Sequence, residues 1–440
     1  MRAVPARARA VASAVVAVAL LLGGCSGQDV QPRRPASPSV SRSTQQNAPT
    51  PSVGREDALA RLLQERAAAV LHHDRARFAA TLDSTTSGFG LRQLAQFDAL
   101  AELPLATFSY GTPEVAPALG AERAAQVGPD AWVSRVQGSY SLAGYDTGER
   151  GFESYFTVVR RTTGWRLADD TDGGTQPQLW DLPRLTVLRS PSVLVVGTGP
   201  ASRLRPYLAL GDRAVRGVAA VWTASWDQRL VLVVPGTSTQ MAEQVGQAAG
   251  DVDQVAAVTD GPFDADGRAG ADRVVVNPGA FARLQDRGKQ VVVTHEATHV
   301  AVRATTDRPV PVWLSEGFAD YVGYRDVGAT RQQVAAALLD RVAHGKGPRA
   351  LPGAGDFDPS RTTIAPSYNA AWLAVCHVAD RWGQDALVRF YLSAATKAEP
   401  TAEAGDADAN TRAAFGSVLH TSEAAFTSSW LAYLRQLARR

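Results

Sequence analysis

The chain has few cysteines and little net charge, and each scarcity excludes a class of protein. Only 2 of its 440 residues are cysteine, at positions 25 and 376, which excludes a scaffold built on several internal disulfides. The formal net charge is +2 and no long basic run occurs, which argues against nucleic acid as a partner. Apolar residues make up 45% and charged residues 20%, so the composition is that of a globular protein long enough for two or three domains.

The first 25 residues are organised like a signal peptide. Arg2, Arg7 and Arg9 give a positive start, and residues 11–22 form an apolar stretch too short to span a membrane comfortably. The stretch ends in Leu-Gly-Gly-Cys at Cys25, which resembles the bacterial lipobox. This resemblance implies that Cys25 carries a diacylglycerol and anchors the protein in the cell membrane, outside the cytoplasm. A plain secretory signal and an uncleaved anchor are the alternatives.

Residues 26–54 are rich in Pro, Ser, Gln and Arg and have no hydrophobic periodicity. We expect a disordered tether with a mean reach of about 30 Å. Once Cys25 is lipidated, Cys376 has no partner for an internal disulfide, and its apolar, helical surroundings predict a small core residue.

Histidine is also scarce, with 7 residues, yet two of them belong to the motif His-Glu-Ala-Thr-His at 295–299. Residues four apart lie on one face of a helix, so His295 and His299 can bind one metal ion. Glu296 then reaches a water on that metal without binding it. The alternative is a helix whose histidines only satisfy local hydrogen bonds. The apolar run 291–293 predicts burial, which is costly for unpaired polar groups and therefore favours the metal.

A second segment compatible with a helix, Trp-Leu-Ser-Glu-Gly-Phe-Ala-Asp-Tyr at 313–321, offers Glu316 as a third ligand. Together the two segments resemble the gluzincin metallopeptidases, especially the smaller bacterial peptidase-MA-like domains. The resemblance implies one zinc ion bound by both motif histidines and Glu316, with Glu296 as general base. It also implies that Asp320 accepts a hydrogen bond from a ligand histidine, although an exposed helix carboxylate is the alternative.

The scarcity of methionine excludes other zinc peptidases. Because only Met1 and Met241 occur, the chain lacks the methionine turn of metzincins and the Gly-x-Met-Glu-Asn strand of aminopeptidases. Val302 and Thr305 stand where a metzincin needs Gly and His. The resemblance therefore favours an endopeptidase. The gap between the two motifs is slightly shorter than in the large gluzincins, a departure that affects the connecting loop more than the ligand Glu316.

Residues 55–186 form the first folded segment, in which helices precede a sheet. Apolar spacing predicts helices at about 59–71 and 90–102. Alternation predicts strands at about 132–142, 152–160 and 164–168. This order, with the ending Gly-Trp-Arg-Leu, resembles the cone-shaped cystatin- and SnoaL-like domains. His72, His73 and Asp74 could suggest a metal or acid–base site, but we expect a solvated helix end.

Residues 187–440 alternate strands and helices and then become helical. The predicted strands are 193–196, 230–234, 254–259 and 273–277. Besides the two motif helices, the predicted helices are 201–223, 238–249, 329–343, 366–382, 384–396 and 421–438. A mixed sheet followed by a helical lobe is the architecture that the gluzincin resemblance implies, so the whole chain is expected to be α+β. Strand 273–277 is either the edge strand of a substrate cleft or an ordinary interior strand.

The predicted chemistry is the hydrolysis of a peptide or amide bond. Three protein ligands leave one zinc position for a water whose pKa falls to about 7, and Glu296 transfers its proton to the leaving amine. An oxyanion donor is also required. Tyr368 opens a helix after Pro366, as the transition-state tyrosine does in aminopeptidase-like gluzincins, although the Lys-Gly that follows it in that family is missing here. His344 and His377 are the alternative donors.

The sequence therefore predicts a membrane-anchored zinc metallopeptidase that acts on a peptide or protein. Two alternatives remain open. One is a non-catalytic binding or scaffolding lipoprotein of the cell envelope with a peptidase-like fold, and the other is an amidase acting on cell-wall material. The sequence predicts neither the substrate nor the oligomeric state.

Overall fold

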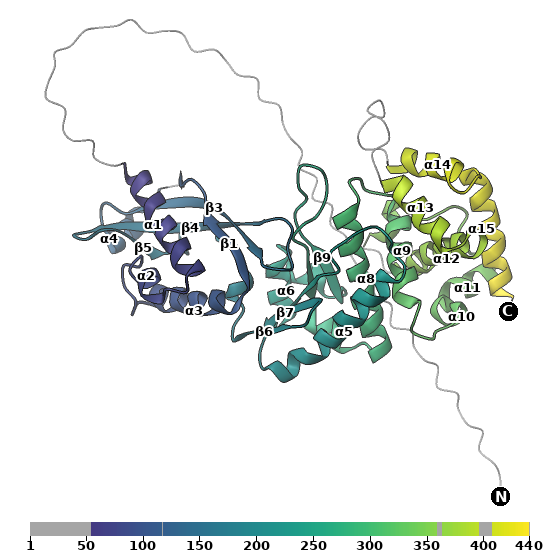
Figure 1. Cartoon of the computed structure of the whole chain (residues 1–440), viewed down its shortest axis with the longest axis horizontal. Helices are drawn as coiled ribbons and strands as arrows, with labels where there is room; N and C mark the ends of the chain where they lie inside the picture. The colour runs from purple at the N-terminus through teal and green to yellow at the C-terminus, as the bar shows by residue number, and fades with distance from the viewer. Residues whose placement is uncertain (1–53, 117, 359–362, 396–406, 440) are drawn as a thin grey trace, which may run out of the picture.

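The computed structural model describes residues 54–439, except 117, 359–362 and 396–406 (Figure 1). The lipidation site predicted at Cys25 and the tether predicted at 26–54 therefore lie outside the described residues, apart from Gly54. In the part of the chain that the structure describes, no helix is both long enough and apolar enough to cross a membrane. One sheet lies at one end of the molecule, a second sheet lies in the middle, and a group of helices forms the other end (Figure 1).

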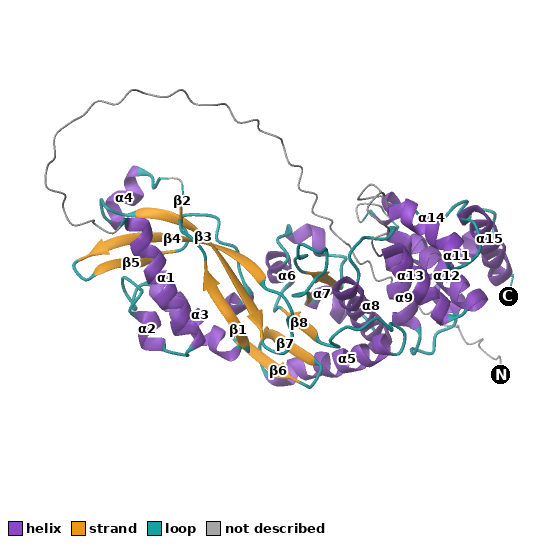
Figure 2. Ribbon diagram, turned by 45° about the horizontal axis from the view of Figure 1, so that its top comes forward, coloured by secondary structure: helices purple, strands orange, loops and turns teal. Residues whose placement is uncertain are grey.

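The first sheet is antiparallel and curls past the helices that precede it (Figure 2). Its strands pair in the order β1-β3-β4-β5, and a short β2 pairs with β3. The strands are β1 (Leu105–Tyr110), β2 (Glu114–Val115), β3 (Trp132–Leu142), β4 (Arg150–Arg161) and β5 (Gly164–Asp169). The helices are α1 (Arg55–Leu71), α2 (Arg75–Ala79), α3 (Gly88–Glu102) and α4 (Ala121–Val127). The sequence had predicted three of these strands but not β1 or β2.

The end of α1 lies in solvent, as expected. His72 caps the helix, His73 has a φ of 54°, and both side chains are exposed. The Asp74 carboxylate accepts a hydrogen bond from the backbone N–H of Arg77 and caps α2. These three residues therefore terminate one helix and begin the next.

The second sheet is mixed and has the strand order β6-β7-β8-β10-β9. Its strands are β6 (Leu185–Arg189), β7 (Val193–Thr198), β8 (Leu230–Val234), β9 (Ala257–Asp260) and β10 (Arg273–Val276). Strand β10 pairs with β8 in parallel and with β9 antiparallel, so it is an interior strand. The possibility that strand 273–277 is the edge of the cleft is therefore wrong. Among the described residues the edge on that side is β9.

Alternation along the central strands divides their side chains between two hydrophobic cores. On β7, Val193 and Val195 belong to a core shared with the helices, whereas Leu194 and Val196 belong to a core shared with the first sheet. Strands β8 and β10 divide in the same way, and Val275 joins the second of these cores. Side chains of a strand point alternately to opposite faces, so a run of valine and leucine means that both faces are covered.

The helices of the second half are α5 (Ala201–Ala219), α6 (Ser238–Gln244), α7 (Pro278–Ala282), α8 (Asp286–Thr305), α9 (Val312–Tyr324), α10 (Arg331–Val334), α11 (Ala336–Ala343), α12 (Ala365–Trp382), α13 (Gln384–Ala395), α14 (Ala407–Ser417) and α15 (Glu423–Ala438). Most of them pack against one face of this sheet and against one another, whereas Met241 and Ala242 of α6 belong to the core shared with the first sheet. The helix predicted at 329–343 is two helices that meet at Ala335, and α14 had not been predicted. Cys376 is buried in α12 as expected.

The two sheets are joined by a buried ion pair. Asp146, in the turn between β3 and β4, accepts two hydrogen bonds from the Arg273 guanidinium of β10, at 2.6 and 2.7 Å. Each side chain is only 1% exposed. In the same turn, the backbone N–H groups of Thr147 and Gly148 donate to the Gly270 carbonyl at 2.9 and 3.1 Å. The first sheet is therefore attached to the second by charge, by backbone hydrogen bonds and by a shared core.

Candidate metal centre

Helix α8 brings His295, Glu296 and His299 into the interior. It begins with Asp286 and has Arg303 in its last turn, charges that suit the two ends of the helix dipole. The helix packs between α5, α9 and the edge strand β9, so its middle is buried on all sides. The exposed fractions are 1% for His295, 0% for Glu296 and 4% for His299.

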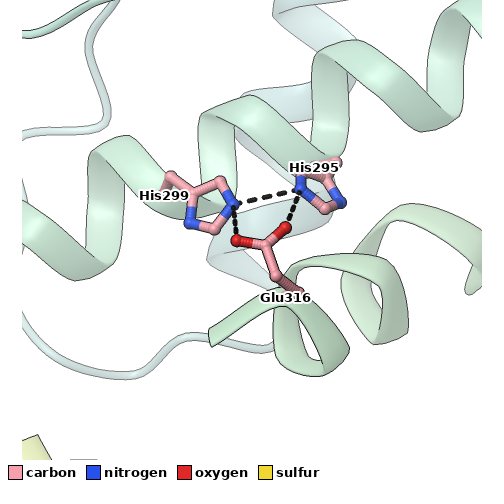
Figure 3. A group of neighbouring side chains, drawn as sticks. All are labelled: His295, His299 and Glu316. Atoms are coloured by element: carbon pink, nitrogen blue, oxygen red, sulfur yellow. Dashed lines mark hydrogen bonds and ion pairs between the residues drawn. The ribbon is translucent and has the colours of Figure 1, made fainter. Parts of the chain in front are cut away.

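Helix α9 supplies the third member of the group. Pro311 precedes α9, and Glu316 lies in its second turn with an exposed fraction of 1%. Figure 3 shows both imidazole rings of α8 and the carboxylate of α9 turned toward one point. The Nε2 atoms of His295 and His299 are 3.0 Å apart, and the Glu316 oxygens are 3.3 Å from the first and 3.7 Å from the second.

These separations fit a single small cation. Ligand atoms at about 2.0–2.1 Å from a tetrahedral ion are about 3.3–3.4 Å from one another, and the three measured separations run from 3.0 to 3.7 Å. Neither carboxylate oxygen of Glu316 has a hydrogen-bond partner of good geometry among the described residues, although both are buried. A buried carboxylate without donors is costly unless a positive charge lies beside it. His295, His299 and Glu316 can therefore hold a metal ion.

Charges within the group favour a cation at the same point. Burial by itself would raise the pKa of Glu316, but the His299 and His295 imidazoles outweigh burial and hold that pKa at about 2. Burial by itself would lower the pKa of His295, yet the Asp320 and Glu316 carboxylates raise it well above its usual value. Both pKa shifts indicate that the buried carboxylates stabilise positive charge on or beside the two imidazoles.

Asp320 contacts His295 as the gluzincin resemblance implies. It follows Glu316 by one turn of α9, and its Oδ1 lies 2.8 Å from the Nδ1 of His295. A carboxylate at this position fixes the proton on Nδ1, so that the lone pair of Nε2 points toward Glu316 and His299. With an exposed fraction of 8%, Asp320 is not the exposed helix carboxylate of the alternative interpretation.

Glu296 lies on a different face of α8 and makes a contact that the sequence had not suggested. Its Oε2 accepts a hydrogen bond from the Thr259 hydroxyl of β9 at 2.8 Å. Its Oε1 has no hydrogen-bond partner among the described residues. Burial raises the pKa of Glu296. One oxygen of this carboxylate is thus held in place, and the other remains available to accept a proton.

The three predicted candidates for an oxyanion donor lie in different surroundings. Tyr368 is buried in the first turn of α12, where its ring packs edge-on against Phe357. His377 lies on the same helix, and its Nε2 forms a hydrogen bond with the Ser429 hydroxyl of α15 at 2.6 Å. Its ring is therefore directed toward α15. His344 is exposed at the end of α11, beside Asp340. None of these observations identifies a donor, so Tyr368 remains a prediction.

A further buried phenol lies near the group. Tyr391 of α13 interacts with the Ser315 side chain, and burial raises the pKa of its phenol. Its ring contacts Phe318 with the ring centres 5.0 Å apart. Sequence patterns do not predict this contact, because α13 has no motif and lies far along the chain from Glu316.

No protein-family model matches the chain, and a search of curated proteins finds no match either. What the protein does must therefore be inferred from the site itself.

Proposed function

We propose that the protein is a zinc-dependent metallopeptidase that hydrolyses peptide bonds, held at the cell membrane by lipidated Cys25. The observation that supports this most strongly is the convergence of His295, His299 and Glu316, with a further buried carboxylate, Glu296, directly after His295 in the chain. A structural metal site has four protein ligands and needs no additional base. Three ligands and a buried glutamate with one available oxygen fit a hydrolytic site.

In this proposal the residues of the site have separate roles. His295, His299 and Glu316 would hold zinc, which supplies a Lewis acid and lowers the pKa of a bound water to about 7. Glu296 would accept a proton on Oε1 from the attacking water and later donate it to the leaving amine. Asp320 keeps the His295 ring in the orientation that directs Nε2 at the ion. Tyr368 is the proposed donor for the oxyanion.

The test compares the wild-type chain with Glu296→Gln. Zinc content is measured by mass spectrometry, and cleavage is measured with fluorescent casein and a library of quenched peptides. We expect about one zinc per chain in both proteins and loss of cleavage in Glu296→Gln of at least about 10²-fold, because general-base catalysis contributes about 10²–10⁴-fold. Glu243→Gln, an exposed glutamate on α6, is the matched control and should leave cleavage unchanged.

Two results would contradict the proposal. Full cleavage by Glu296→Gln would remove Glu296 from the chemistry, and a chain that binds no zinc would remove the site. Cleavage of cell-wall material without cleavage of any protein or peptide would instead identify an amidase. A wild-type chain that holds zinc and cleaves none of these substrates would support the scaffolding alternative.

A further inference from the structure

The edge strand β9 connects the first sheet to the metal centre. Its last two residues point to different neighbours. Thr259 contacts Glu296 of α8, whereas Asp260 contacts Arg150, the first residue of β4 in the first sheet. Two adjacent residues on a four-residue strand therefore join the proposed general base to a part of the chain more than 100 residues earlier.

The contact on the first-sheet side is charged and partly exposed, because the Asp260 side chain is 37% exposed. The Arg150 guanidinium donates to the Asp260 carbonyl at 3.1 Å and also forms an ion pair with the Asp260 carboxylate. The Arg150 side chain is 17% exposed. A guanidinium that binds both a backbone oxygen and a side chain of one residue restrains the position of that residue more than a single contact does.

The contact on the metal side is directional. Thr259 is 5% exposed, and its hydroxyl lies 2.8 Å from Glu296 Oε2 and 3.1 Å from the Glu296 carbonyl. A hydroxyl has one proton to donate, so the shorter distance and the negative charge favour the carboxylate as acceptor. The strand therefore determines where this carboxylate is held.

The loop that follows β9 is held on both sides as well. Arg303 of α8 donates to the Asp272 carboxylate at 2.8 and 3.1 Å and to the Gly261 carbonyl at 2.9 Å. From the first sheet, the turn at 147–148 reaches Gly270, where an added Cβ would lie only 2.7 Å from the Gly148 nitrogen. The strand β9 and its loop thus lie between the first sheet and α8, with direct contacts to each.

From these contacts we propose that the first sheet positions the general base: Arg150 fixes β9, and Thr259 on β9 holds the Glu296 carboxylate for proton transfer. Thr259 and Arg150 are positioning residues, because neither contacts the ligand group. The inference rests on the proposed function in so far as it names Glu296 the base. It also gives the first sheet a role other than that of a spacer or a separate binding module.

The first experiment changes the Thr259 hydroxyl alone. In Thr259→Val the shape is kept and the hydrogen bond is lost, so we expect kcat on the best quenched peptide to fall about 10- to 100-fold while KM changes less than about threefold. Thr259→Ser restores the hydroxyl and should recover kcat to within about threefold. Zinc content should stay near one per chain in all three proteins. Thr186→Val, at the opposite edge of the same sheet, removes a hydroxyl bonded to the Gly199 carbonyl and should leave kcat unchanged.

The second experiment tests the first-sheet side without relying on activity. Amide hydrogen exchange of residues 257–260 is followed by mass spectrometry in the zinc-loaded full chain. Arg150→Gln should speed this exchange about tenfold and lower kcat, whereas Arg150→Lys should have a smaller effect. Arg161→Gln is the matched control, because Arg161 lies on the same strand and pairs with Asp83 inside the first sheet's own segment.

The outcomes separate this inference from the proposed function. Unchanged exchange of 257–260 in Arg150→Gln, or a Thr259→Val protein with wild-type kcat, would overturn the positioning role. A decrease of kcat in Thr259→Val that Thr259→Ser does not reverse would also overturn it, since packing would then be the cause. If the wild type binds zinc and cleaves no substrate, the proposed function fails, and the exchange measurement still decides whether the first sheet holds β9.

Discussion

Removing the charge of Asp146 is the most direct perturbation of the junction between the two sheets. In Asp146→Asn the side chain keeps its shape, but the Arg273 guanidinium loses its counterion while remaining 1% exposed. Its other contacts are the Asp272 carbonyl at 3.1 Å and the Tyr140 ring, and neither is a negative charge. Breaking a buried ion pair from one side costs about 3–5 kcal/mol, because the remaining ion is buried and unpaired.

That cost corresponds to a change of about 10²- to 10⁴-fold in the unfolding equilibrium constant. The assay is urea unfolding followed by tryptophan fluorescence and by far-ultraviolet circular dichroism. The control is Asp83→Asn, which breaks the ion pair with Arg161, whose side chain is 43% exposed. Such a pair contributes about 0–1 kcal/mol. The transition of Asp146→Asn should shift to lower urea by several times the shift of the control.

A double variant decides whether charge burial is the cause. Asp146→Leu combined with Arg273→Met removes both charges, so it should recover most of the stability lost in Asp146→Asn. The reasoning fails if Asp146→Asn unfolds within about 1 kcal/mol of the wild type. It fails equally if the double variant is as unstable as the single one, since packing or the lost hydrogen bond from the Leu142 backbone N–H to Asp146 would then outweigh charge.

Two other predictions concern α9. Asp320→Ala removes the acceptor for His295 Nδ1, so zinc affinity measured by chelator competition should fall about 10- to 100-fold. The control Asp326→Ala, at an exposed position, should not change the affinity. Equal zinc affinities of the two variants would contradict the orienting role of Asp320. Gly317→Ala would place a Cβ 2.5 Å from the Ala371 carbonyl of α12, so α9 and α12 must separate and the free energy of unfolding should fall by about 1–3 kcal/mol. Gly416→Ala in α14, where a Cβ meets nothing within 4 Å, should be neutral or stabilising, and a similar loss at both glycines would show that close approach is not the cause.

The site could be predicted where its geometry follows from spacing along one helix. His295 and His299 are four residues apart, and Asp320 follows Glu316 by four, so each pair shares one face of its own helix. That the two helices meet cannot be read from spacing. It depends on packing that Gly317 permits, because a larger residue there would collide with the backbone of α12.

The contacts that could not be predicted join segments distant in sequence. Thr259 lies on a short strand without a motif, 37 residues before Glu296. Arg273 precedes three valines, and its partner Asp146 is 127 residues away. Alternation also cannot distinguish an edge strand from an interior strand when both faces are apolar, so the sequence alone does not decide which of the two β10 is. Strand β6 begins at Leu185, so the second sheet starts before residue 187, where the second segment had been predicted to begin.

The core shared by both sheets limits how this protein can be studied in pieces. A fragment containing the helices of the candidate metal centre but not the first sheet would expose apolar side chains such as Leu194, Val196, Val231 and Val233 and would leave Arg273 without Asp146. Large exposed apolar patches promote aggregation. Such a fragment is therefore a poor starting point for crystallisation or for assays, and the two halves should be expressed as one chain.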